Sequence, residues 1–126
     1  MNYIINKCYV GWDLKNKITG GFMDLLFNLL KKIHKRPGLY LGKKSLTYLT
    51  HFEHGFYWGT EACEEEHPDI AIITEPDFWF KFDEFVYMYY NETMGTMSAT
   101  TLIIEHSDSE EDAFDKYFEL LNTFLK

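Results

Sequence analysis

The chain has 126 residues and a net charge of −8, from 12 Lys/Arg and 20 Asp/Glu. This length is typical of one domain with one core. No apolar run reaches the ~20 residues that a bilayer-spanning helix needs, and the first residues lack a signal-peptide pattern. Cys8 and Cys63 are too few and too far apart to indicate a disulfide framework. We therefore expect a soluble cytoplasmic protein with free thiols.

The charges are divided unevenly along the chain. Residues 1–44 hold nine Lys/Arg and two acidic residues, a net +7, whereas residues 45–126 hold three Lys and eighteen acidic residues, a net −15. An acidic body repels phosphate backbones, so we expect no direct binding of nucleic acid. It attracts basic proteins instead. The alternative is that the acidic helix faces are merely solvated.

Residues 1–21 differ from the rest of the chain. Asn and Gly residues interrupt every apolar run there, although residues 3–5 and 8–10 could form short strands. We expect an extended N-terminal arm over residues 1–21 and a single helical domain over residues 22–126.

The first helix is predicted from Phe22 onward, where apolar residues recur at helical spacing and form one face: Phe22, Leu25, Leu26, Leu29, Leu30 and Ile33. Pro37 ends it, because proline disfavours helix at the preceding residue. The connector that follows contains Gly38 and Gly42, and we expect its apolar triplet, residues 39–41, to insert into the core. Ser45 is a good N-cap for a second helix. A loop that contacts a ligand is the other interpretation of this connector.

The second helix is predicted over residues 46–65. Its expected buried face contains Leu46, Leu49, Phe52, Phe56 and Cys63, with Gly59 where another helix would approach closely. A neighbouring stripe should face outward and holds Thr47, His51, His54, Trp58, Glu61 and Glu65. An exposed tryptophan flanked by histidines and carboxylates is a candidate contact patch. Packing of the N-terminal arm on this stripe would explain it equally well.

Residues 70–73 are too short a run to decide between a strand and a buried linker. The third helix, residues 77–90, is apolar nearly all round. Phe78, Phe82, Phe85 and Tyr89 form one face, while Phe80 and Tyr87 lie on roughly the opposite side. Such a helix is either central in the fold or shared with a second copy. Phe80 and Tyr87 are therefore candidate contacts of a homodimer.

The C-terminal part begins with a loop at residues 91–97. Residues 99–106 fit either a strand or a short helix. Asp108 and Glu111 have the spacing of a capping box, and the last helix should bury Ala113, Phe114, Tyr117, Leu120, Leu121, Phe124 and Leu125. The predicted fold is mainly α, a compact four- or five-helix domain with room for one or two short strands.

The search for catalytic chemistry gives little. His51, His54, Cys63 and His67 lie within one stretch, but on a continuous helix the first two point away from the last two, so we expect no metal site. No base is evident for Cys63. No glycine-rich phosphate loop occurs, and the carboxylates should lie on solvated faces and not in an apolar pocket that would raise a pKa. We expect no enzyme and no cofactor.

Two resemblances involve the connector. Residues 36–42, Arg-Pro-Gly-Leu-Tyr-Leu-Gly, resemble a loop near the ATP site of type II topoisomerase ATPase subunits, but the other nucleotide-binding motifs of that family are missing. A wider pattern has three parts in chain order. The connector and the start of the second helix (Ser45, Leu46, Leu49, Phe52 and Gly55) come first, the aromatic helix at residues 77–90 follows, and residues 110–121 with Phe124 come last. This order, over about residues 24–126, resembles small bacterial immunity proteins of contact-dependent growth inhibition and related polymorphic toxin systems.

The resemblance implies a non-enzymatic antitoxin that binds one toxin domain and blocks its active site or substrate surface. The charge division favours a basic toxin, such as a nuclease. On physical grounds we choose an aromatic anchor in an acidic rim as the toxin-binding site: Trp58, Glu61, Glu64, Glu65, Glu66, Asp108, Glu110, Glu111 and Asp112. An acidic adaptor for another basic partner and a small enzyme are the alternatives.

Overall fold

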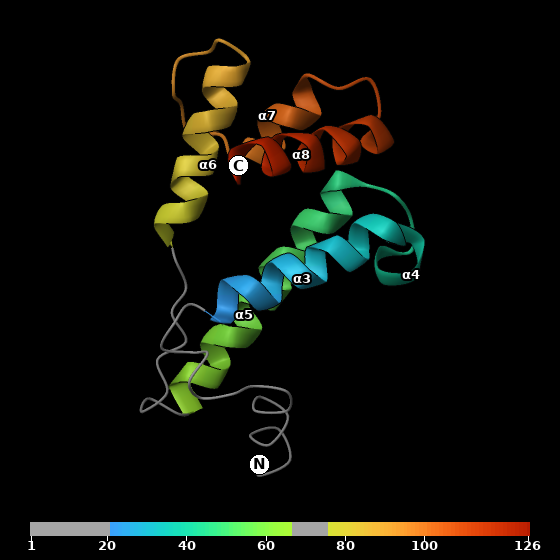
Figure 1. Ribbon diagram of the computed structural model, residues 1–126, viewed down its shortest axis with the longest axis vertical. Coiled ribbons are helices and arrows are strands. Elements are labelled where there is room, and N and C mark those ends of the chain that lie inside the picture. The colour runs from blue at the N-terminus through green and yellow to red at the C-terminus, as the bar shows by residue number, and fades with distance from the viewer. Residues whose placement is uncertain (1–20, 67–75) are drawn as a thin grey trace.

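The computed structural model describes residues 21–66 and 76–126, and within them it contains six α-helices and no strand (Figure 1). The helices are α3 (Gly21–Lys35), α4 (Pro37–Leu41), α5 (Leu46–Glu66), α6 (Pro76–Tyr89), α7 (Ala99–Glu105) and α8 (Glu110–Phe124). The mainly α fold is thereby confirmed. The predicted arm at residues 1–21, apart from Gly21, and the segment 70–73 lie outside the described residues. None of the described helices combines the length and hydropathy needed to cross a membrane.

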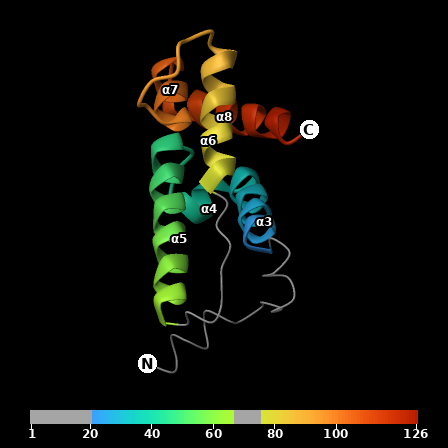
Figure 2. The ribbon, with the colours of Figure 1, turned by 90° about the vertical axis from the view of Figure 1, so that its left-hand side faces the viewer.

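The helices form two groups along the long axis of the molecule. Figures 1 and 2 show α6, α7 and α8 together at one end, while α5 starts beside them and extends away toward the end where α3 also lies. The core lies where α3, α5, α6, α7 and α8 meet. Its fully buried side chains include Ile33, Leu49, Phe82, Leu102 and Phe114. The C-terminal half of α5 therefore projects from the more compact end.

The apolar faces of α3 and α8 largely match their predictions. In α3, Leu26, Leu30 and Ile33 are buried, but Leu25 is exposed. In α8, the predicted core residues up to Leu121 are buried, whereas Leu125 is exposed. Phe118 is an addition to the predicted core, and its ring stacks on His34 with 4.1 Å between ring centroids.

The connector does not insert its apolar triplet into the core, so that prediction is wrong. Residues 37–41 form the single turn α4, which directs Leu39 and Tyr40 to solvent; Leu39 is 70% exposed. Only Leu41 packs against the core. Gly42 has a φ of 85°, a left-handed conformation that favours glycine, and its N–H donates to the carbonyl of Gly38 over 3.0 Å.

The start of α5 confirms Ser45 as its N-cap, since the Ser45 hydroxyl accepts a hydrogen bond from the N–H of Tyr48 over 3.2 Å. Further along, Leu46 and Leu49 are buried, and Phe52 and Phe56 are partly buried. No atom of the described residues lies within 4 Å of the position that a Cβ of Gly59 would take. None of the six described helices therefore makes the predicted close approach at Gly59.

Helix α6 is central to its own chain. Phe82, Val86 and Tyr87 are buried. The Tyr87 hydroxyl donates to the carbonyl of Met97 and accepts from its N–H, both over 3.1 Å, so Tyr87 holds the loop after α6. A dimer contact through Tyr87 would require that loop to move, because only 3% of Tyr87 is exposed. Phe80, the other candidate, is exposed.

The ambiguous segment at residues 99–106 forms α7. Its first backbone N–H, from Ala99, donates to the Asp83 carboxylate of α6 over 2.8 Å, and Ser98 caps the helix by accepting from the N–H of Thr101. The cap of α8 is Ser109, which accepts from the N–H of Asp112 over 3.1 Å. The predicted capping box at Asp108 and Glu111 is thus wrong by one residue.

Candidate functional site

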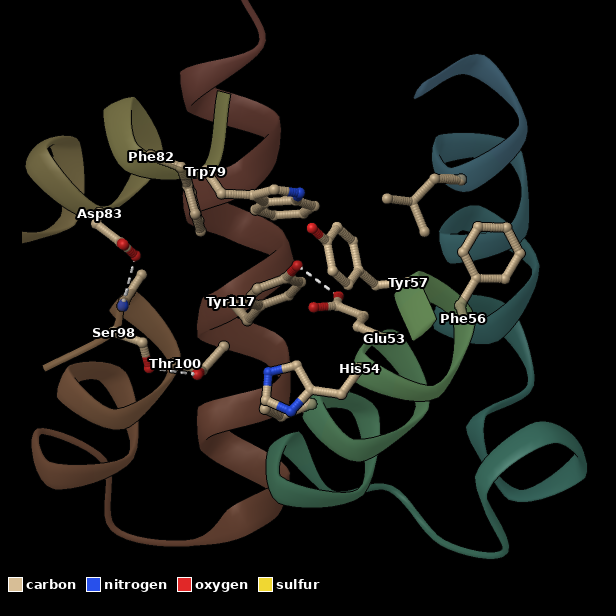
Figure 3. A pocket seen from close by; sticks show the side chains of 13 residues that line it. Glu53, His54, Phe56, Tyr57, Trp79, Phe82, Asp83, Ser98, Thr100 and Tyr117 are labelled. Carbon is tan, nitrogen blue, oxygen red and sulfur yellow. Dashed lines mark hydrogen bonds between the residues drawn. The ribbon is translucent and has the colours of Figure 1, made fainter. Parts of the chain in front are cut away.

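A cavity of about 230 Å³ lies where five helices meet, and Figure 3 shows it from close by. Helix α5 supplies most of one wall, α6 supplies the opposite wall, and α3, α7 and α8 complete it. Its lining is mainly apolar with a few polar groups: Leu26, Thr50, Glu53, His54, Phe56, Tyr57, Trp79, Phe82, Asp83, Ser98, Ala99, Thr100 and Tyr117. A largely apolar cavity with a few convergent polar groups is the usual form of a binding site.

The centre of the cavity is a hydrogen bond between two side chains far apart in sequence. The Tyr117 hydroxyl of α8 donates to Oε1 of Glu53 on α5 over 2.7 Å. Burial raises the pKa of Glu53 to about 7, and the bond from Tyr117 opposes this only in part. The pKa of Tyr117 lies well above its usual value because of its burial and because of the adjacent Glu53 charge.

Glu53 overturns the prediction that no carboxylate lies in an apolar pocket. The spacing of Leu46, Leu49, Glu53 and Phe56 already places this residue on the buried face of α5, at an interval of four from one core leucine and seven from another. A charged residue at a core-facing position is the signal that could have identified the site. Phe52, the residue before Glu53, also fits the apolar spacing of this face, and this hides the signal in the sequence.

Three more side chains define the surroundings of the bond. Figure 3 shows Trp79 on one side of the Glu53–Tyr117 pair and His54 on the other. Asp83 lies beside Ser98; burial raises the pKa of its carboxyl, and the hydrogen bond from the N–H of Ala99 opposes that rise. The charge of Asp83 also raises the pKa of Tyr117, so both carboxylates act on one hydroxyl group.

One carboxylate oxygen of the site has no donor among the described residues. In the part of the chain that the structure describes, Oε2 of Glu53 accepts no hydrogen bond. A carboxyl group with a pKa of about 7 can exchange a proton near neutral pH, and once ionised it can bind a cation. Among the same residues, no three His, Cys, Asp or Glu gather as a metal site. The side chain of Cys63, and His67, lie outside the described part.

The predicted contact stripe continues from this cavity along α5. His54 and Tyr57 line the cavity, and the Tyr57 ring meets that of Trp58 edge-on with 5.9 Å between centroids. Trp58 is 66% exposed, and Glu61, one turn further, is partly exposed. The backbone of residues 64–66 forms the last turn of α5, although their side chains lie outside the described set. Cavity and stripe therefore form one continuous surface.

The second predicted acidic group lies at the first turn of α8. Asp108, Glu111 and Asp112 are exposed. Glu110 instead reaches to the start of α5, where its Oε2 accepts from the Ser45 hydroxyl and from the N–H of Thr47, each over 3.0 Å, and its Oε1 accepts from the Thr47 hydroxyl. Burial alone would raise the pKa of Glu110, but these bonds and one from the N–H of Leu46 outweigh it and lower the pKa.

The structure separates the two acidic groups that the sequence placed in one site. Glu110 contacts Thr47 at the start of α5, whereas Trp58 is eleven residues and Glu66 nineteen residues further along the same helix. At ~1.5 Å per residue these separations are about 17 Å and about 28 Å. A compact binding site can contain the Trp58 stripe or the α8 terminus, and only a broad partner would cover both.

No protein-family model matches this chain, no curated protein is significantly similar to it in sequence, and no solved structure significantly matches its fold.

Proposed function

We propose that this chain is an immunity protein that acts in the cytoplasm by binding one toxin domain and blocking its active site or substrate surface. The observation that carries the proposal is the exposed Trp58 on the projecting half of α5, beside Glu61 and the acidic last turn. A large aromatic side chain that is not part of the core formed by the described residues is the kind of residue that anchors protein interfaces. Acidic neighbours then select a basic partner.

The charge distribution supports a basic partner such as a nuclease domain. Eighteen of the twenty acidic residues lie in residues 45–126, which include all of α5 to α8. Charges of this density speed the encounter with a basic protein and matter less at high salt. We assign the contact itself to the stripe from His54 to Glu61, and long-range steering to the exposed acids of the α8 terminus.

The proposal is tested by co-expressing the chain with the toxin-like C-terminal domain encoded immediately upstream of its gene. The expected results are rescue of growth and a complex that co-purifies at about 100 mM salt and weakens at about 500 mM. A complex that resists salt would assign the binding energy to the aromatic surface. Absence of both rescue and complex would overturn the proposal and favour an acidic adaptor for another basic partner.

The contact surface is tested with two exposed aromatic residues of the same helix. Trp58→Ala should weaken the complex by about tenfold or more, as expected for a hot spot. Tyr48→Ala, at the opposite end of α5, is the matched control and should leave the affinity unchanged. Equal effects of both substitutions would exclude the stripe as the contact surface.

A further inference from the structure

We propose that the cavity beside Trp58 receives a lysine or arginine side chain of the protein partner, with the Glu53 carboxylate as its counter-charge and Trp79 and Phe82 as walls for its methylene groups. This inference rests on the proposed function. It names which chemical group of the partner enters the chain, and where.

The size of the cavity favours a single side chain as the occupant. Sites for drug-sized ligands have volumes of ~300–1,000 Å³, whereas this cavity has about 230 Å³. Its apolar walls suit the methylene groups of a long basic side chain, because such chains bury their stems and keep the charge at a polar group.

The chemistry of the lining selects a cation. Glu53 and Asp83 contribute two carboxyl groups, and none of the described residues of the lining is a lysine or arginine. Oε2 of Glu53 accepts no hydrogen bond from the described residues, so a place for a donor exists beside the Tyr117 bond. Trp79 and Phe82 present aromatic rings to the same space, and aromatic faces attract ammonium and guanidinium groups.

The fold alone gives little reason for a carboxyl group at this place. Burial opposes the ionised form of Glu53 strongly enough to bring its pKa to about 7, and one hydroxyl group is its partner. An apolar residue of similar volume would avoid that cost, as replacements of buried charges often show. A cation from a partner would supply the missing counter-charge.

The position of the cavity agrees with the contact surface. Tyr57 lines the cavity and touches the ring of Trp58, so a partner that covers Trp58 also covers the cavity. One basic side chain could enter the cavity while the surrounding surface of the partner packs on Trp58. This arrangement places a charged contact at the centre of the interface, where it is shielded from solvent.

The first test uses small probes on the full chain. The chain is titrated with n-butylammonium chloride and n-propylguanidinium chloride, which copy the two side chains, and with 1-butanol as a neutral control. The readout is the indole N–H signal of Trp79 in ¹H–¹⁵N spectra, assigned with Trp79→Phe. We expect a saturable shift in the millimolar range with at least one cation and a response at least about fivefold weaker with 1-butanol.

Two variants identify the carboxyl group responsible. Glu53→Gln keeps the shape of the side chain and should weaken binding of the cation by about fivefold or more. Glu84→Gln, an exposed carboxylate on α6 next to Asp83 in sequence, is the matched control and should bind like the unaltered chain. Equal binding of 1-butanol, equal binding by Glu53→Gln, or the absence of any saturable shift would each overturn the inference.

A pH series gives a second readout that does not depend on the Glu53 variant folding well. Among the described residues of the lining, the groups beside Glu53 that carry or change charge are His54 on α5, Asp83 on α6 and Tyr117 on α8. In a His54→Gln background, affinity for the cation should rise by about tenfold from pH ~6 to pH ~8, because Glu53 must ionise to bind it. A flat profile would overturn the inference.

The complex with the toxin domain separates this inference from the proposed function. If the unaltered chain rescues growth and Glu53→Gln binds the toxin domain as tightly, the inference fails while the immunity function stands. If the chain neither rescues growth nor binds the toxin domain, yet takes up n-butylammonium through Glu53, the proposed function fails and the cavity is a site for a free amine. Weaker binding by Glu53→Gln in both assays supports both proposals.

Discussion

Two carboxyl groups beside the same helix differ in almost every respect. Glu110 lies at the start of α5 and accepts hydrogen bonds from Ser45, from Leu46 and twice from Thr47, which lower its pKa although burial would raise it. Glu53 lies in the middle of α5 and has the Tyr117 hydroxyl as its donor, so burial dominates and brings its pKa to about 7. Glu53 lies far deeper in the protein than Glu110, so burial dominates at Glu53, whereas at Glu110 the four hydrogen bonds outweigh a smaller effect of burial.

The comparison shows how two carboxyl groups that contact one helix, Glu110 from α8 and Glu53 of α5 itself, can have different surroundings. At the start of α5, Ser45 and Thr47 donate to the two oxygens of Glu110. Further along α5, Glu53 lines a cavity, and its Oε2 has no donor among the described residues. A carboxyl group that lines a cavity and has a single donor among the described residues is a better indication of a binding site than the density of charge on the surface.

The largest expected effect is the pH dependence of stability caused by Glu53. Its pKa in the folded state, about 7, exceeds the ordinary value of 4.5, so between these values the folded state binds more protons than the unfolded state. The free energy of unfolding should therefore fall as pH rises from about 4.5 to about 7, by on the order of 3 kcal/mol. Denaturant unfolding at several pH values measures it, and Glu53→Gln should remove this fall. A persistent fall in the variant would assign it to another group.

Removal of the Glu110 carboxylate should cost about 2 kcal/mol of unfolding free energy, because Ser45 is 1% exposed and loses its acceptor. The measurement is urea unfolding of Glu110→Ala near neutral pH. Glu111→Ala is the matched control, an exposed glutamate in the same turn, and should lie within about 0.5 kcal/mol of the unaltered chain. Equal costs would mean that the bonds at the start of α5 add no stability.

Tyr117→Phe tests the donor at Glu53 and should cost about 1 kcal/mol near pH 5, where Glu53 is protonated. The pKa of Glu53 should rise further, because the bond from Tyr117 is what opposes the effect of burial. The carboxyl ¹³C signal of Glu53 followed through a pH titration measures this shift. An unchanged midpoint would show that the bond contributes nothing to the pKa.

The smallest expected effect is the acid dependence due to Glu110. Its pKa is lowered in the folded state, so its contribution to stability is present above the ordinary pKa and is lost as pH falls through the folded value. Near neutral pH the unaltered chain should be more stable than Glu110→Gln, and this difference in unfolding free energy should shrink on acidification. The contribution of Glu53 to the unfolding free energy changes in the opposite direction, since it grows on acidification. A difference that grows on acidification would contradict the lowered pKa.

Much of the fold could be predicted because its signals are local. Three of these signals depend on neighbouring residues alone: the end of α3 before Pro37, the Ser45 cap of α5 and the apolar spacing of α8. The helical state of α7 could not be decided locally, since its first N–H is bound by Asp83, sixteen residues earlier. The direction of Leu39 likewise depends on how the single turn of α4 lies on the rest of the protein.

The candidate site was only half predictable. Trp58 and Glu61 were placed correctly on one exposed side, because helical periodicity defines a face. The cavity could not be foreseen, because it needs Trp79, Asp83 and Tyr117 from helices whose packing on α5 is a tertiary event. The α8 terminus was grouped with Trp58 by charge alone, and charge does not report distance along a helix.

The position of Glu110 has a consequence for how the protein opens. This side chain belongs to the first turn of α8 and also closes the first turn of α5, so one negative charge faces the positive ends of two helix dipoles at once. Neither helix can fray at this end without loss of the shared group. Amide hydrogens of residues 46–49 and 110–113 should therefore exchange with solvent as a single unit, and the two segments, more than sixty residues apart in the chain, should open and close together.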